Sequence, residues 1–417
     1  MKSRFFTSAK TNTLANLVGE VLLNVAPFIW FYFLNKYQGS ESVAEFAVLG
    51  SLYAFGKSFI EFGMNNEAIA EVAAGNKYVV MEVILARLFL TFILFLAFLG
   101  CSVFFDTRQY LFLSLLPLLV IPFSVDWVFK AQQQSYLNVI AAGCSFVLSF
   151  IPVIFLGVGV FQLLISKLIW MVIYALVIYV FFLRCEQYGT YFKWPASLKH
   201  LLIVALDKIK ACWSYALSSL VVTGSQNVPI LLVAYWMNAS DAGYFSFFIK
   251  LYGIFLIFKY VMMVSFLPKL ARLFKEEKNS AIAELLRGTA LGFLAVFCLL
   301  ILLYYFKDLA FAFLGFDLSE FNYLTPFVMV LMMAAMVSWL YIYLPSLLIL
   351  QHRRNNFLLA VSIGMFTSSG ALALLNYVGM LNLLNSAIAI VLSEVAVLIY
   401  LIYVLRLELF QWKYRYD

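Results

Sequence analysis

Long apolar segments recur along almost the whole chain, and they constrain its fold more than any other feature. Twelve can be delimited, each continuously apolar for about 20 residues, the length at which a helix crosses the hydrocarbon core of a bilayer. They cover residues 12–34, 43–62, 80–105, 109–128, 137–158, 160–183, 211–236, 242–266, 288–306, 323–349, 357–375 and 380–404. Strands of a membrane barrel would be about ten residues long with strict alternation, so the segments predict helices.

The composition is that of a chain surrounded by lipid. Hydrophobic residues make up 65% of the 417 residues and charged residues only 12%, whereas soluble domains carry roughly 25% charged residues. This excludes a soluble globular protein and a disordered chain. The five cysteines form no CxxC pair, so the sequence indicates neither a disulfide framework nor a zinc site.

Lysine and arginine are distributed very unequally between the two sets of loops. One side holds twenty of them and the other side three, which are Lys36, Arg108 and Lys307. Because basic loops stay in the cytoplasm, this bias predicts that both termini are cytoplasmic. The net charge of +7 then belongs at the anionic inner leaflet, and we expect no nucleic-acid partner.

The longest polar interval divides the predicted spans into six and six. We therefore expect an N-terminal six-helix bundle over 1–183, a cytoplasmic linker over 184–210 and a C-terminal six-helix bundle over 211–417. The overall fold class predicted is an all-α polytopic membrane protein with twelve transmembrane helices.

Short motifs recur in the two halves. The second span opens with SVAEF from Ser42, and the eighth opens with SDAGY from Ser240. Pro27 and Pro229 interrupt the first and seventh spans at matching places, which favours a parallel internal repeat with gating helices at these prolines. Chance similarity between apolar helices is the alternative.

Ionisable side chains inside the predicted spans are the strongest functional signal, since each costs at least about 2.5 kcal/mol in lipid. The embedded bases are Lys57, Arg87, Lys167, Lys250 and Lys259, and the candidate embedded acids are Glu20, Asp126 and Glu394.

Two interpretations of these charges are open. In one they neutralise each other in a static network. In the other they line an aqueous cavity that binds an anion, and the excess of two cations favours it. The residues expected to line this cavity are Lys250, Arg87, Lys57 and Lys167. Lys259 lies near the inner end of its span, and we expect its side chain to extend to the membrane surface.

The embedded acids have a second possible role in ion coupling. Burial favours the protonated form of a carboxyl group and a nearby cation favours the ionised form, so a group between the two can exchange a proton or hold a sodium ion. Glu20 and Glu394, and with them Asp126, are the candidates. H⁺ or Na⁺ is the only cofactor expected, and a fixed ion pair with Lys57 or Arg87 is the alternative.

Motifs for catalysis are missing from the sequence. It contains no GxxxxGK[ST], no HExxH and no GxSxG, and no loop is large enough to carry an enzyme site. The layout therefore favours a gated carrier and not an enzyme.

Several short stretches carry a family resemblance. The sequence FIEFGMN over 59–65 precedes an AIA over 68–70, and DWVFK covers 126–130. AGYF over 242–245 is followed by Lys250, FLPKL covers 266–270, and Ser393 precedes Glu394. In these stretches the chain resembles the Wzx O-antigen flippases of the multidrug/oligosaccharidyl-lipid/polysaccharide exporter superfamily. It departs from their pattern at Phe62, at Lys130-Ala131 and at Lys269.

The resemblance implies a MATE-like fold in a bacterial inner membrane. It also implies the substrate, an O-antigen or related repeat unit linked to undecaprenyl diphosphate, which is moved from the cytoplasmic to the periplasmic leaflet by alternating access. An ion gradient would drive transport, and other polysaccharide assembly proteins are possible partners. The alternatives are a multidrug antiporter of the same fold, a membrane enzyme acting on lipid-linked sugars, and a scaffold of polysaccharide assembly.

Overall fold

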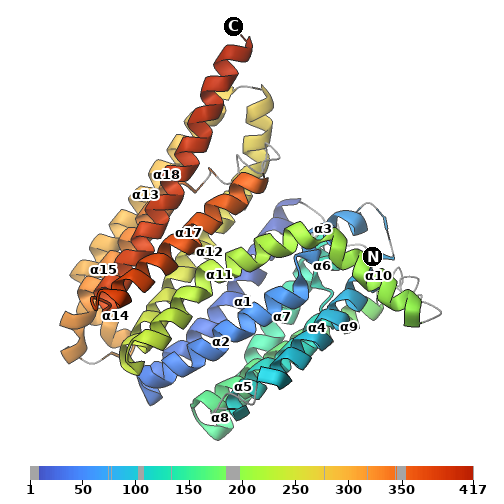
Figure 1. Ribbon diagram of the computed structural model, residues 1–417, viewed down its shortest axis with the longest axis horizontal. Coiled ribbons are helices and arrows are strands. Elements are labelled where there is room, and N and C mark those ends of the chain that lie inside the picture. The colour runs from blue at the N-terminus through green and yellow to red at the C-terminus, as the bar shows by residue number, and fades with distance from the viewer. Residues whose placement is uncertain are drawn as a thin grey trace. The chain divides into compact units, whose positions relative to one another are not determined.

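Every regular element that the structure describes is a helix (Figure 1). The computed structural model describes residues 9–73, 75–76, 78–101, 108–132, 134–184, 198–276, 278–316, 318–342, 344 and 354–416. The chain divides into two compact units, here called unit 1 (Met1–Trp30 and Val48–Thr223) and unit 2 (Phe31–Ala47 and Gly224–Asp417). The division into bundles at residues 183 and 211 remains a prediction.

Three helices contribute to both units. They are α1 (Ala9–Gln38), α2 (Ser40–Glu61) and α11 (Trp213–Trp236). Pro27 lies inside α1 and Pro229 inside α11, and both helices continue past their proline. Their role as gating positions remains a prediction.

Unit 1 is completed by short and long helices. In chain order these are α3 (Met64–Ala73), α4 (Val79–Cys101), α5 (Arg108–Leu115), the 3₁₀ helix η3 (Leu116–Phe123), α6 (Asp126–Ala131), α7 (Tyr136–Ser149), α8 (Ile151–Leu156), α9 (Val160–Arg184) and α10 (Leu198–Ala211). The predicted helix over 109–128 is thus an α-helix that changes to a 3₁₀ helix. Pro117 and Pro122 lack the N–H that an α-helix needs at these positions, which accounts for the change.

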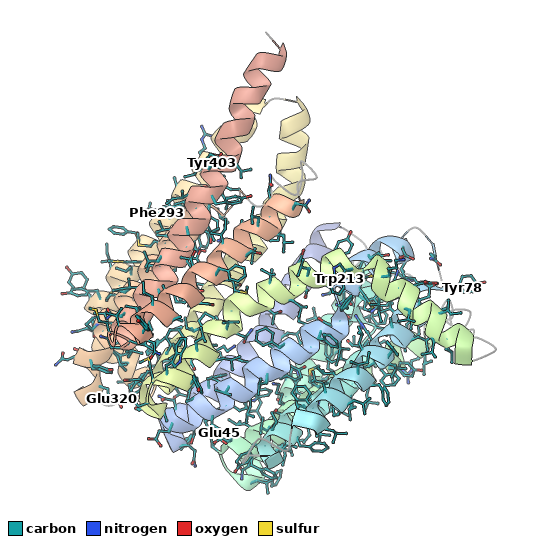
Figure 2. The ribbon with its side chains drawn as sticks, in the orientation of Figure 1. Glu45, Tyr78, Trp213, Phe293, Glu320 and Tyr403 are labelled. Atoms are coloured by element: carbon teal, nitrogen blue, oxygen red, sulfur yellow. The ribbon has the colours of Figure 1, made fainter. Side chains whose placement is uncertain are left out.

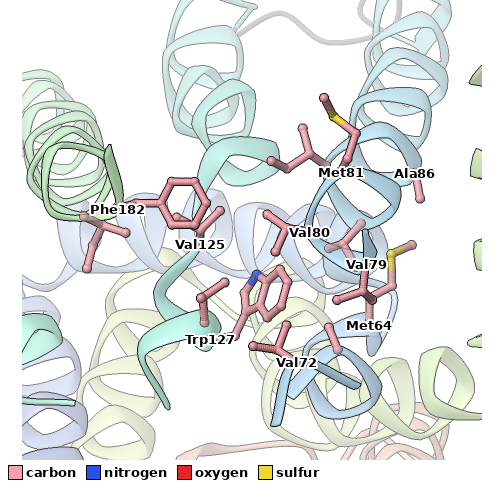
Figure 3. Packing of buried hydrophobic residues seen from close by; sticks show 14 of the residues in the cluster. Met64, Val72, Val79, Val80, Met81, Ala86, Val125, Trp127 and Phe182 are labelled. Atoms are coloured by element: carbon pink, nitrogen blue, oxygen red, sulfur yellow. The ribbon is translucent and has the colours of Figure 1, made fainter. Parts of the chain in front are cut away.

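The core of unit 1 forms where short helices pack against long ones. Trp127 of α6 is 1% exposed and lies beside Val72 of α3 and Val80 of α4 (Figure 3). Phe129 of α6 and Phe182 of α9 are fully buried in the same cluster. This packing fixes α6, and with it the polar residues at the start of that helix.

Unit 2 consists mainly of long helices. They are α12 (Ala239–Glu276), α13 (Lys278–Tyr305), α14 (Lys307–Phe313), α15 (Leu318–Leu340), α17 (Arg354–Tyr377) and α18 (Leu383–Tyr416). Helix α18 packs against α15 and α17, and α12 contacts α13, α15 and α18. The core of unit 2 includes the aromatic side chains of Phe245, Phe248 and Phe327.

Within the described residues, nine helices are long and apolar enough to cross a membrane. They begin at Ser40, Val79, Tyr136, Val160, Tyr215, Arg287, Asn322, Asn355 and Leu383. The other three predicted spans fall on α1, on α5 with η3, and on α12, so the total of twelve remains a prediction. Large apolar side chains cover the outer faces, as Trp213 and Tyr403 illustrate in Figure 2.

The turn after α2 depends on a glycine. Gly63 has φ +67°, and a Cβ there would lie 2.5 Å from the backbone carbon of Tyr215. We predict that Gly63→Ala lowers the free energy of unfolding by about 2–4 kcal/mol, because it adds left-handed strain to a steric clash. Thermal unfolding in detergent tests this. Gly50→Ala is the control, since a Cβ at Gly50 meets nothing within 4 Å, and equal effects of the two variants would contradict the explanation.

Candidate functional site

Among the embedded cations whose side chains the structure describes, Lys250 is the one without a hydrogen bond, ion pair or ring contact. Lys250 lies in α12 and is partly exposed. Its side chain forms no hydrogen bond or ion pair in the part of the chain that the structure describes. The preceding turns of α12 are held in the aromatic core, where Phe248 stacks on Phe316 with ring centroids 5.3 Å apart. The position of the lysine is therefore fixed by packing, while its ammonium group is unpaired.

The neighbourhood of Lys250 on α12 is open on one side. Gly253 follows one turn later, and a Cβ at this glycine would meet no described atom within 4 Å. Ser246 precedes Lys250 by one turn, and its buried hydroxyl also has no hydrogen-bond partner among the described residues. One stripe of α12 thus combines an unpaired cation, an unpaired hydroxyl and free space.

Glu394 lies in a polar cluster of unit 2. Tyr252 of α12 donates a hydrogen bond of 2.6 Å to Oε1 of Glu394, and Tyr341, directly after α15, donates to Oε2. Lys259 Nζ lies 2.6 Å from the Ser338 hydroxyl and 3.8 Å from the centre of the Tyr341 ring. We name these five residues the Glu394 cluster, and it joins α12, α15 and α18.

The location of Lys259 corrects an expectation from the sequence. Its depth in the span predicted that the side chain extends to the membrane surface. The structure instead directs its ammonium group to Ser338, which is fully buried, and to the face of Tyr341. Hydrogen bonding and a cation–π contact satisfy the charge inside the helix packing.

The predicted cavity residue Lys167 contacts an aromatic ring in unit 1. Its side chain on α9 is 8% exposed, and its Nζ lies 3.5 Å from the centre of the Tyr53 ring on α2. Lys57, further along α2, is 3.9 Å from Glu61, and its side chain is 44% exposed. A role of either lysine in substrate binding remains a prediction.

Arg87 and Asp126 are brought together around Ser124 in unit 1. Arg87 is 1% exposed, donates to the Ser124 carbonyl at 2.9 Å and to the amide oxygen of Asn65. Asp126 accepts a hydrogen bond of 2.9 Å from the Ser124 hydroxyl and lies 3.7 Å from Lys130. Both charges thus take part in an internal network, and their roles in substrate binding and ion coupling remain predictions. Glu20 lies in α1, but its side chain falls outside the description.

Sequence analysis missed one charged cluster of unit 1. Lys208 of α10 is 6% exposed and binds Glu67 at 3.2 Å and Glu71 at 2.5 Å, both on α3. The thiol of Cys212 donates to Glu67 at 2.8 Å. The sequence contains a signal for this cluster. Glu67 and Glu71 are four residues apart, and so are Lys208 and Cys212, and this spacing places two side chains on one face of a helix.

The ionisation of this cluster follows from its contacts. Burial opposes the charged forms, but the Cys212 hydrogen bond and the Lys208 charge lower the pKa of Glu67. The two carboxylates likewise outweigh burial at Lys208 and raise its pKa. Burial and the hydrogen bond to Glu67 raise the pKa of the Cys212 thiol to about 12. The cluster is therefore a stable ion pair with an unreactive thiol, and it ties α10 to α3.

Comparison with known proteins identifies the fold. No model of a known protein family matches the sequence. No curated protein matches it either. Among solved structures, the chain is similar to an inward-facing multidrug resistance MATE transporter of the MOP superfamily, with TM-score 0.72 and 15% identity over 97% of this chain and 96% of that one. Lipid II flippase MurJ in an inward closed conformation gives TM-score 0.70 and 11% identity over 95% and 88%.

A third solved structure agrees with these two. A MOP superfamily transporter from Pyrococcus furiosus gives TM-score 0.64 and 14% identity over 94% of this chain and 93% of that chain. The chain is therefore an all-α polytopic membrane protein with the fold that the MATE transporters and MurJ share. This confirms the predicted fold class, while the count of twelve helices and the location of the termini remain predictions.

We name Lys208, Glu67, Glu71 and Cys212 the Lys208 cluster. Its ionisation predicts that it stabilises the fold only within a limited range of pH. The lowered pKa of Glu67 means that its contribution is present above the unfolded glutamate pKa of about 4.3 and is lost as the pH falls below it. The raised pKa of Lys208 means that its contribution is present below the unfolded lysine pKa of about 10.4 and is lost above it.

Lys208→Met should remove this stabilisation, at a cost of about 1–3 kcal/mol near neutral pH, because two partly buried carboxylates lose their cation. Thermal unfolding from pH 4 to pH 11 measures the effect. Lys210→Met is the control, since Lys210 is exposed and lies two residues further along α10. A loss of similar size in both variants would show that the cluster is not stabilising.

Proposed function

We propose that the chain is a flippase that moves undecaprenyl-diphosphate-linked O-antigen or related repeat units across a bacterial inner membrane. Movement is from the cytoplasmic to the periplasmic leaflet by alternating access, driven by an ion gradient. The fold supports a carrier, since the similar solved structures are named as transporters and as a lipid flippase. The resemblance of the sequence to Wzx flippases supports the lipid-linked substrate.

The observation that carries the proposal is the unpaired ammonium group of Lys250. A lysine in a membrane span costs at least about 2.5 kcal/mol unless water, an acid or a ligand compensates it. No acid does so among the described residues. A diphosphate group offers several charged oxygens to an ammonium group, and such charge-assisted hydrogen bonds are among the strong ones. The site therefore suits an anionic headgroup.

The open space beside Lys250 suits the rest of the substrate. Sugars attached to the diphosphate need room and water, and Gly253 leaves room on the same stripe of the helix. The polyprenyl chain needs neither and can remain in lipid. A carrier of organic cations would instead need an unpaired acid, whereas both carboxylate oxygens of Glu394 already accept hydrogen bonds.

Removal of the Lys250 charge tests the proposal. We predict that Lys250→Ala reduces translocation of a labelled lipid-linked glycan by about tenfold or more, because a charged hydrogen bond to phosphate is lost. Lys250→Arg should retain part of the activity, and Lys210→Ala, which removes an exposed cation, should retain all of it. Translocation is measured in proteoliposomes with a reagent that reacts only with outward-facing glycan.

Other outcomes of this assay would overturn the proposal. Normal translocation by Lys250→Ala would remove the role of this lysine in diphosphate binding. Cleavage of the glycan would indicate an enzyme, binding without movement would indicate a scaffold, and uptake of organic cations instead of glycan would indicate a multidrug antiporter.

Filling the space beside Lys250 tests the location of the sugars. Gly253→Leu should reduce translocation of a long glycan several-fold more than that of a single-sugar analogue, because the side chain occupies room that only the larger headgroup needs. Gly370→Leu is the control, since Gly370 is also surrounded by free space but lies on α17. Equal translocation of both substrates by Gly253→Leu would place the sugars elsewhere.

A further inference from the structure

Helix α10 exposes large apolar side chains although it is too short to cross a membrane. Its 14 residues, Leu198–Ala211, extend about 21 Å at the rise of an α-helix, whereas the hydrocarbon core of a bilayer is about 30 Å thick. Leu202, Ile203 and Leu206 are nevertheless exposed within little more than one turn. A contiguous apolar face of this kind marks a surface that meets another apolar environment.

The other side of α10 is fixed to the core of unit 1. Ala205 and Lys208 of this helix are buried, and so is Cys212 directly after it. Ala205 and Cys212 belong to the same core cluster as Val79 and Val80 of α4, while Lys208 joins α10 to α3 through two carboxylates. These three residues follow each other at helical spacing, so the fold holds the apolar face of α10 outward.

The position of α10 in unit 1 is that of a membrane surface. It packs against α4, where one candidate span begins at Val79, and a second begins at Tyr215, four residues after α10 ends. Trp213, which is 65% exposed, directly precedes the second of these spans, and the exposed Tyr78 precedes the first. Both aromatic residues lie at the end of unit 1 that carries α10 (Figure 2). Tryptophan and tyrosine are enriched at the level of the lipid headgroups, so α10 lies at that level.

The charges near α10 suit an anionic membrane surface. The interval 184–210 contains more basic than acidic residues, namely Arg184, Lys193, Lys199, Lys208 and Lys210 against Glu186 and Asp207. Lys210 is exposed and follows Leu206 by four residues, which places it on the apolar face. Asp207, also exposed, lies three residues before Lys210. A lysine in this position buries its methylene groups against lipid while its ammonium group reaches a headgroup phosphate.

We propose that the outward face of α10, which comprises Leu202, Ile203, Leu206 and Lys210 together with Trp213, binds anionic phospholipids of the inner leaflet. The apolar side chains lie among the first carbons of the acyl chains, and Lys210 contacts a lipid phosphate. The interval 184–210, expected from the sequence to be a cytoplasmic linker, is then anchored to the membrane surface by α10. Lipid is the occupant because the face is continuous with the apolar span that begins at Tyr215. This proposal is independent of the proposed function.

Quenching of Trp213 fluorescence by brominated lipids tests the depth of α10. The full chain is placed in liposomes, and subtraction of the Trp213→Phe signal isolates this residue. Bromine near the headgroup end of the acyl chain should quench this signal at least about twofold more than bromine near the chain end, because an interfacial helix enters only the outer part of the leaflet. Trp170→Phe is the control, since Trp170 is buried against Trp30 and its signal should respond little to either lipid.

A second comparison tests the preference for anionic lipid. At equal mole fraction, brominated phosphatidylglycerol should quench Trp213 more strongly than brominated phosphatidylcholine. Lys210→Gln should reduce this preference by about threefold to fivefold, the contribution of one lysine near an anionic surface. Lys36→Gln is the matched control, because Lys36 is exposed but belongs to the opposite set of loops, and it should leave the preference unchanged.

Other outcomes would overturn the proposal. Quenching of Trp213 by aqueous iodide but not by brominated lipid would place α10 in water. Strongest quenching by bromine near the chain end would make α10 part of a span. Equal quenching by the two lipid classes, or an unchanged preference in a folded Lys210→Gln variant, would remove the anionic lipid. Protection from both lipid and iodide in a dimeric sample would show that a second copy of the chain covers this face.

Discussion

The cost of holding a charge among apolar helices is the constraint on which the structure depends. With 65% hydrophobic residues, the chain has few polar groups to compensate an embedded ion. Most of its embedded charges nevertheless have partners. Arg87 binds a carbonyl and an amide, Lys167 lies over Tyr53, and Lys259 contacts Ser338 and Tyr341. Against this background the unpaired Lys250 stands apart, and it gives unit 2 its proposed anion site.

Helix α12 carries polar residues on two of its faces. Its aromatic residues, including Phe245 and Phe248, anchor it in the core. One face then carries Lys250, and another face contacts Glu394 through Tyr252.

Much of the fold could be predicted from the sequence because membrane helices are determined by length and hydropathy. The 3₁₀ segment at Pro117 and Pro122 departs from the prediction, although the prolines were a visible signal. The charged residues were harder to place. Depth in the span predicts a position at the membrane surface for Lys259, because depth does not reveal Ser338, which is 79 residues away. The Lys208 cluster was missed because its partners on α3 are more than 130 residues distant.

We propose that the Lys250 ammonium group binds the diphosphate of a lipid-linked glycan. A density map of the full chain in lipid nanodiscs with undecaprenyl-diphosphate-linked glycan tests it most directly. We expect a phosphate oxygen within hydrogen-bond distance of Lys250 Nζ and the first sugars beside Gly253. A map in which the headgroup lies elsewhere while Lys250 is paired with an acid of the chain would contradict it.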